Sequence, residues 1–181
     1  MRSLLLTASL TIVSSASGAA PAPTLPPGNP FHDRSALPYE LPPFDRIKDS
    51  DYRPALEAGM REELREVRRI AHDAHPADFR NTLVALERSG ELLNRVSATF
   101  QHLNSCNTDP EMQKIDAEMA PRLSAHEDAI LLDPALSARV DSLYRRRADL
   151  GLDPESLFES LYGRAPEIGR PPSRMVPLFG R

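Results

Sequence analysis

A chain of 181 residues that is 40% hydrophobic is long enough to fold around one buried core. Its net charge of −4 gives no reason to expect nucleic acid as a partner, because proteins that bind nucleic acid carry a basic patch. Cys106 is the single cysteine, which excludes an internal disulfide. No companion group supports a reactive thiol at Cys106, so we interpret it as a spectator.

Residues 1–19 are typical of an export signal. Arg2 supplies a positive charge, residues 4–13 are mostly apolar, and residues 16–19 are small enough for a signal peptidase. The apolar run is too short for a permanent membrane anchor, which needs about 20 residues. We therefore expect an exported chain, periplasmic or secreted, with no membrane contact after cleavage. A disordered apolar N-terminus is the alternative.

Residues 20–48 are rich in proline and polar residues, which predicts an extended leader laid over the surface of a helical body. We expect the apolar side chains of this leader to dock on that body. These anchors are Phe31, Leu37, Tyr39, Leu41 and Phe44.

Residues 49–158 carry the helical signals. A first helix is expected to begin at a cap, Ser50 or Asp51, to contain Pro54 in its first turn and to end at Pro76. Its apolar stripe is Leu56, Met60, Leu64, Val67 and Ala71.

Residues 81–100, NTLVALERSGELLNRVSATF, predict one continuous amphipathic helix capped by Asn81 or Thr82. Glu91 and Arg95 stand four apart in the favourable order, worth about 0.2–0.5 kcal/mol. Gly90 lies inside the stripe, where it costs about 1 kcal/mol relative to alanine and indicates a closely packed neighbouring helix. The apolar face is Leu83, Leu86, Gly90, Leu93, Val96, Ser97, Phe100 and Leu103.

Asp-Pro pairs at 109–110, 133–134 and 153–154 mark further helix starts, because proline suits the first helical position. The third helix should be kinked or split by Pro121, and the fourth should stop at Gly151. Their apolar residues are Met112, Ile115, Met119, Leu123, Ile130 and Leu131, then Leu136, Val140, Leu143 and Tyr144. No strand pattern competes. The predicted class is all-α, an antiparallel helical bundle fragment with an extended Pro-rich N-terminal leader.

Few residues suggest chemistry. His72 and His75 would seat a metal only if a third ligand approached, and a helix end stabilised by histidine is the simpler reading. We interpret His126, beside Glu127 and Asp128, as part of a charged helix face. Zinc peptidases need H-E-x-x-H on a helix, with two histidines one turn apart and a glutamate for the water. The sequence lacks that motif.

We interpret the three consecutive arginines at 145–147 as part of a solvated helix face beside Asp141 and Asp149, rather than as a binding patch. We therefore assign no catalytic, cofactor-binding or metal residue in this chain.

The succession of segments resembles the N-terminal region of the thimet oligopeptidase-type zinc metallopeptidases, in particular the peptidyl-dipeptidase (dipeptidyl carboxypeptidase) branch. The similar segments include NPF at 29–31, LPYELPPFDRIKDSDYRPALEAGM at 37–60, residues 81–100 and 103–144, and LGLDPES ending at Ser156. The resemblance implies a full-length family that binds zinc and removes dipeptides from the C-termini of short peptides. The N-terminal helices would form part of the wall of its substrate channel. No zinc ligand or catalytic residue can be carried over, so we expect this chain alone to be inactive.

After about Leu157 the composition departs from the family. Residues 159–181 are rich in proline and arginine, and we expect them to be a non-homologous, disordered tail. A truncation or frameshift would produce such a tail, and a genuine alternative terminus would also do so. Helices missing after this point would leave apolar surface uncovered, which favours self-association.

Two functions follow. The first is the N-terminal segment of an exported zinc peptidyl-dipeptidase. The second is a free-standing exported helical protein that binds a partner through an apolar face.

Overall fold

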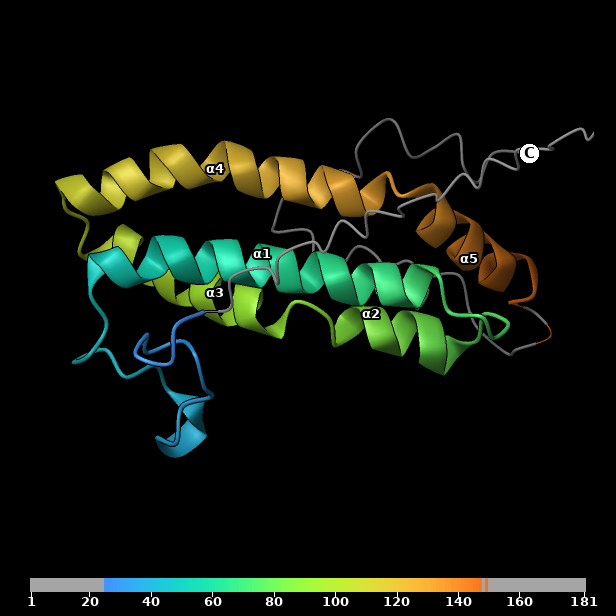
Figure 1. Cartoon of the computed structure of the whole chain (residues 1–181), viewed down its shortest axis with the longest axis horizontal. Helices are drawn as coiled ribbons and strands as arrows, with labels where there is room; N and C mark the ends of the chain where they lie inside the picture. Colours follow the sequence, from blue (N-terminus) through green and yellow to red (C-terminus); the bar gives the residue numbers. More distant parts are fainter. Residues whose placement is uncertain (1–24, 148, 150–181) are drawn as a thin grey trace, which may run out of the picture.

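The computed structural model describes residues 25–147 and residue 149. These residues form helices, turns and loops without any strand, which confirms the all-α class (Figure 1). The expected export signal, the Asp153-Pro154 pair and the tail lie outside the described residues. Within the described part, no helix has both the length and the apolar character that crossing a membrane requires.

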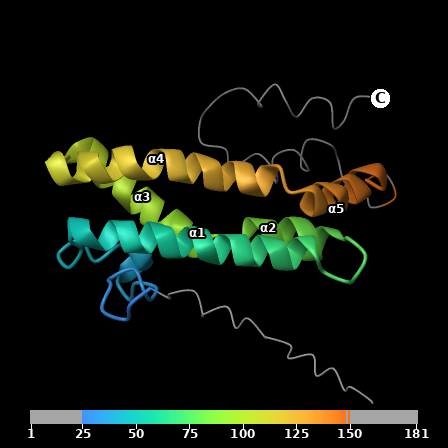
Figure 2. The ribbon, with the colours of Figure 1, turned by 45° about the horizontal axis from the view of Figure 1, so that its top comes forward.

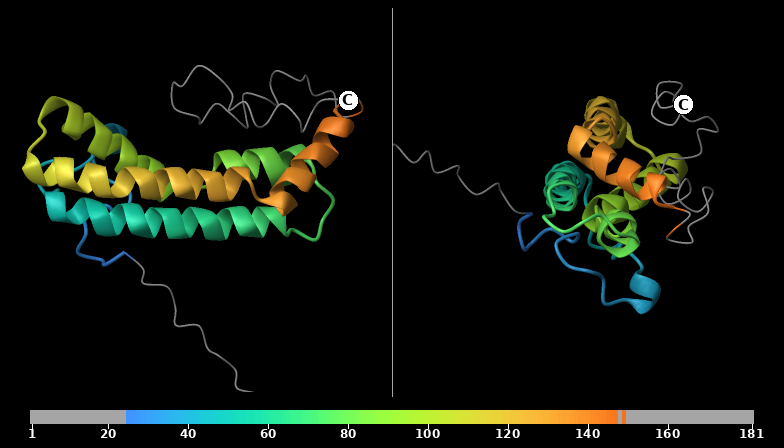
Figure 3. Two further views of the ribbon diagram at one scale, coloured as in Figure 1. Left: turned by 90° about the horizontal axis from the view of Figure 1, so that it is seen from above. Right: turned by 90° about the vertical axis from the view of Figure 1, so that its right-hand side faces the viewer.

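Helix α1 (Asp49–Ala71) is the centre of the bundle and contacts every other long helix. The chain then runs back along α1 through η2 (Phe79–Val84), α2 (Ala85–Glu87) and α3 (Glu91–Cys106). Helix α4 (Pro110–Leu131) returns beside α1, and α5 (Pro134–Arg145) closes the far end (Figure 2). Seen end-on, α1, α4 and the green α2–α3 stretch lie around one axis (right panel of Figure 3).

The start of α1 is set by Asp51, although the helix begins earlier than expected. The Lys48 N–H donates to the Asp51 carboxylate across 2.9 Å, so Asp51 caps from inside the first turn rather than from outside it. Pro54 lies inside the helix, beyond the first turn in which it was expected. The helix ends at Ala71 and not at Pro76, because the chain turns at His72 and Asp73.

The prediction of one continuous helix over 81–100 was wrong. Asp78, not Asn81 or Thr82, is the N-cap, and it accepts from the Asn81 N–H. The helix breaks at Gly90, which has a left-handed backbone with φ +68°. Glycine adopts this conformation without a steric penalty, and Ser89 closes the preceding turn by donating to the Leu86 carbonyl. The predicted Glu91–Arg95 pair is confirmed at 3.3 Å.

The main core lies between α1, α3 and α4. It confirms the apolar stripes except at the end of α4, where Leu131 is exposed. Tyr52 sits at its centre, with ring centroids 5.5 Å from Phe31 and 5.1 Å from Phe100. Burial raises the pKa of Tyr52 to about 12, with nearby Asp49 and Asp51 adding to the effect. Other buried members are Leu56, Met60, Leu93, Val96, Met112, Ile115 and Met119. A smaller cluster of Val67, Leu136 and Val140 continues the core toward α5.

Helices α1 and α3 meet most closely at Gly59. A Cβ atom at this position would stand 2.8 Å from Cα of Leu93, which is closer than real contacts allow. The absence of a side chain at Gly59 therefore lets the two backbones touch. The sequence pattern had assigned this role to Gly90.

The Asp-Pro starts of α4 and α5 are confirmed. Asp109 accepts from the N–H groups of Glu111 and Met112 at 2.9 Å, and Asp133 caps α5 in the same way. Pro121 does not split α4, which runs unbroken through it. Proline removes one backbone hydrogen bond, and both Pro121 and Ala117 one turn before it lie on the exposed face. Helix α5 ends at Arg145, before the expected stop at Gly151.

The segment before α1 docks only in part. Leu25 and Phe31 are buried, and the Asn29 amide donates to the Asp51 carbonyl across 3.0 Å. The other four expected anchors, in residues 37–44, are exposed, so their predicted docking was wrong. We call residues 37–44 the apolar loop; its single 3₁₀ turn, η1 (Pro38–Glu40), stands away from the bundle in Figure 1.

Candidate functional site

A buried hydrogen-bonded pair of polar side chains joins the two long helices α1 and α4. The Nε2 atom of His126 lies 2.9 Å from Oε2 of Glu63, and the two side chains are only 4% and 12% exposed. The Nδ1 atom of His126 is buried and has no hydrogen-bond partner among the described residues. The expected charged face at His126 was therefore wrong. His126 follows buried Met119 by seven residues, which is two helical turns, and this spacing could have predicted its burial.

The N-terminus of α3 rests against the same stretch of α1. Glu66 accepts the Gly90 N–H across 2.8 Å, and the Glu63 carboxylate occupies the space that a Cβ at Gly90 would need. Helix N-termini carry partial positive charge, which two nearby carboxylates complement. Glu63 thus connects three helices: its own, α3 through Gly90, and α4 through His126.

A second polar cluster surrounds Arg139 of α5, whose side chain is 8% exposed. Its Nε donates to the Thr82 hydroxyl at 3.0 Å, and its Nη1 donates to the carbonyls of Asp73 and His75 at 3.0 Å. Its Nη2 lies 3.5 Å from the Asp73 carboxylate, an ion-pair contact without hydrogen-bond geometry. Arg139 therefore fixes the loop that follows α1. No role was predicted for Arg139, although its position between Leu136 and Val140 on the apolar stripe indicates burial.

Asp73 is held in its charged form by the same loop. The backbone and then the side chain of His75 donate to Asp73, which lowers the pKa of that carboxyl below its ordinary value of 3.8. Arg139 adds a smaller effect in the same direction.

Acid should therefore weaken the fold in part through Asp73. A carboxyl whose pKa is lower in the folded state adds stability above its ordinary pKa and loses it as the pH falls through the folded value. We expect Asp73→Asn to flatten the fall in melting temperature below about pH 4 that the parent chain shows. Circular dichroism melts from pH 7 to pH 2.5 check this, with Asp45→Asn at an exposed position as the control. Equal acid sensitivity in Asp73→Asn and the parent would contradict it.

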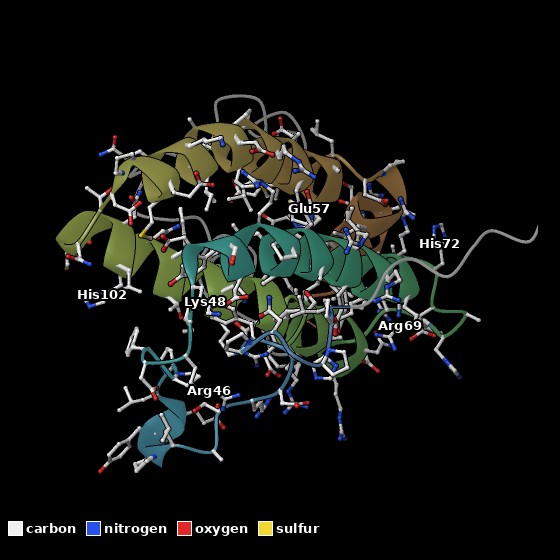
Figure 4. The ribbon with its side chains drawn as sticks, turned by 60° about the vertical axis from the view of Figure 1, so that its left-hand side comes forward. Arg46, Lys48, Glu57, Arg69, His72 and His102 are labelled. Carbon is white, nitrogen blue, oxygen red and sulfur yellow. The ribbon has the colours of Figure 1, made fainter. Side chains whose placement is uncertain are left out.

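The two clusters border an open hollow between α1 and the η2–α2 segment. Its polar wall consists of Glu66, Arg69, His72, Asp73, Asn81 and Arg88. Figure 4 shows Arg69 and His72 at the C-terminal end of α1. The acids of this wall, Glu66 and Asp73, accept hydrogen bonds from Gly90 and His75, and Arg69 and Arg88 place two guanidinium groups beside them.

His72, His75 and His102 do not come together into a metal site. His75 turns to Asp73, with Nδ1 2.8 Å from its carboxylate, while His72 and His102 lie at opposite ends of the bundle (Figure 4). Across residues 25–147, no three His, Cys, Asp or Glu side chains come together as a metal site would require. Cys106 is exposed at the end of α3.

The three arginines at the end of α5 behave differently from one another. Arg145 pairs with Asp141 at 2.8 Å, as a solvated face predicts. Arg146 donates to the Ala77 carbonyl, and Arg147 stacks over the Tyr144 ring at 4.1 Å. Two of the three therefore hold local structure.

Comparison with known proteins gives consistent relatives, although no model of a known protein family matches the chain. Dipeptidyl carboxypeptidase of Salmonella typhimurium is 46% identical over 129 residues, which are 71% of this chain and 19% of that protein. Dipeptidyl carboxypeptidase of Escherichia coli is 43% identical over the same length. Oligopeptidase A of Escherichia coli is 28% identical over 89 residues, 49% of this chain and 13% of that protein. The match thus spans about a fifth of the length of the first two relatives.

Proposed function

Because this chain is a relative of the dipeptidyl carboxypeptidases, matched over their N-terminal segment only, we propose that it is the N-terminal helical part of an exported zinc peptidyl-dipeptidase. The single observation that carries the proposal is the identity of 46% over 129 residues. The matched residues make up only 19% of the relative, so the groups that perform the chemistry are assigned to the remainder. Export rests on the pattern of residues 1–19.

The proposed activity of the whole enzyme is release of dipeptides from the C-termini of short peptides. A zinc ion would supply the activated water in the remainder of the enzyme. The α1, α3 and α4 bundle would contribute a rigid wall that restricts access to short, unfolded peptides. Its rigidity is supported by the continuous core and by the Glu63–His126 pair between its long helices.

A reconstitution experiment tests this proposal. The chain is mixed with an Escherichia coli dipeptidyl carboxypeptidase from which the matched N-terminal segment has been deleted. We expect the mixture to release dipeptides from a short peptide, measured by liquid chromatography, while neither part does so alone with added zinc. The full-length Escherichia coli enzyme is the positive control.

Two results would contradict the proposal. One is a zinc-dependent turnover by the chain alone that chelator abolishes and repurification retains. The other is failure of the chain both to bind the deleted enzyme and to restore its activity. Binding of an unrelated exported protein in place of the enzyme would favour the second candidate, a free-standing binding protein. The exposed side chains of the apolar loop are the observation that supports that candidate.

A further inference from the structure

The apolar loop concentrates exposed hydrophobic side chains in a short segment. Tyr39 is 97% exposed, and Leu37, Leu41 and Phe44 are 47%, 51% and 47% exposed. Among the described residues outside this loop, the comparable side chains are Phe79, Leu131 and Leu132. Single exposed apolar residues are ordinary, but a group of four at one place marks an interaction surface.

The loop is held rigidly despite its exposure. The Glu40 N–H donates to the Leu37 carbonyl at 3.0 Å, and the Phe44 N–H donates to the Pro42 carbonyl at 2.8 Å. At its base, Arg34 bonds to the Glu91 carboxylate of α3 through Nε at 2.7 Å and also pairs with Glu40 at 3.6 Å. Three prolines, at 38, 42 and 43, limit the backbone further. A rigid loop loses little conformational entropy on binding.

The backbone at the tip of the loop is strained. Tyr39 and Glu40 have φ values of 59° and 55°, and among the described residues they are the non-glycine residues with positive φ. A left-handed backbone is unfavourable for residues that carry a Cβ atom. The Tyr39 side chain adds no packing that would offset this strain, because it is almost fully exposed. Strain of this kind is characteristic of segments that clamp a ligand or partner.

We propose that the apolar loop docks on an apolar surface of the catalytic remainder of the peptidyl-dipeptidase, with Tyr39 as its central anchor. This inference rests on the proposed function. Tyrosine and phenylalanine are common anchors of interfaces, because they bury a large rigid surface. The matched residues are 19% of the Salmonella typhimurium relative, so the larger part of that chain is available beside them.

Size and charge favour this occupant over two others. A stable interface between two copies needs about 1,000 Å² or more of buried surface, which one short loop does not supply. A contact within one covalent chain requires less, because the effective concentration of the two parts is high. A membrane surface would attract an excess of basic residues, whereas Arg46 and Lys48 beside the loop are balanced by Glu40 and Asp45.

The test compares two triple variants of the full chain. One is Leu37→Ser/Tyr39→Ser/Phe44→Ser in the loop. The control is Phe79→Ser/Leu131→Ser/Leu132→Ser, at exposed apolar positions elsewhere. Binding to the Escherichia coli enzyme lacking its matched segment is measured by calorimetry, and dipeptide release is measured in the same mixtures. Circular dichroism must show parental helicity and melting in both variants.

We expect the loop variant to bind at least tenfold more weakly and to lose most of the restored activity, while the control changes less than about threefold, since near-neutral contacts surround a few dominant ones. Parental binding by the loop variant, or equal weakening by the control, would overturn this inference and leave the proposed function standing. Failure of the parent chain to bind would overturn both. Sedimentation that shows a dimer abolished only in the loop variant, with the mixed complex intact, would identify a second copy as the occupant instead.

Discussion

Replacing Leu93 by aspartate should unfold the helical body. Leu93 is 7% exposed and belongs to the core that α1, α3 and α4 share. The new carboxylate would be buried beside Gly59 of α1, in a predominantly apolar cluster. An uncompensated buried charge costs roughly 3–5 kcal/mol, a large part of the roughly 5–15 kcal/mol that stabilises a typical domain.

Far-ultraviolet circular dichroism and urea unfolding measure this effect. The matched control is Leu132→Asp, at a leucine that is 71% exposed, and its unfolding free energy should change by less than about 0.5 kcal/mol. Unchanged helicity and an unchanged urea midpoint in Leu93→Asp would show that α3 does not pack as described.

Substitution of Gly59 by leucine should separate α1 from α3. The first side-chain atom would meet Cα and N of Leu93 at 2.8 and 2.9 Å, and a backbone cannot move aside as a flexible side chain can. Overpacking of a core typically costs about 1–3 kcal/mol, and we expect a loss of about 3 kcal/mol or more because the obstacle is a backbone. The gain of about 1 kcal/mol from replacing a helical glycine offsets only part of it.

Urea unfolding again gives the measurement, and Gly28→Leu is the matched control. A Cβ at Gly28 would have no neighbour within 4 Å, so that variant should unfold at the parental urea concentration. Equal stability of the two leucine variants would mean that α1 and α3 are farther apart than the structure has them.

The features that the sequence predicted correctly are local ones. The stripes on the helices, the Asp-Pro starts at 109 and 133, and the Glu91–Arg95 pair depend on residues that are close together in the sequence. The break at Gly90 depended on more distant residues. Its place on the apolar stripe suited a continuous helix, and the contacts that hold the break come from Glu63 and Glu66 of α1.

The polar clusters were harder to anticipate for the same reason. His126 and Arg139 stand at stripe positions, but a single polar residue there can equally mark the edge of a buried face. Their burial requires partners from distant segments: Glu63 for His126, and the 73–75 loop with Thr82 for Arg139. Exposure of the apolar loop could not be foreseen either, because hydrophobic side chains normally predict docking.

The Glu63–His126 pair also bears on which alignments of α4 against α1 are available. Apolar stripes repeat with each helical turn, so packing alone would tolerate a slip of one turn, about 5.4 Å along the axis. Such a slip would carry His126 away from Glu63 and leave both polar groups buried without each other, at a cost of roughly 1–3 kcal/mol. The pair therefore favours one alignment of α4 along α1. It selects one alignment among several of similar hydrophobic energy, much as a single buried polar residue fixes the stagger of a coiled coil.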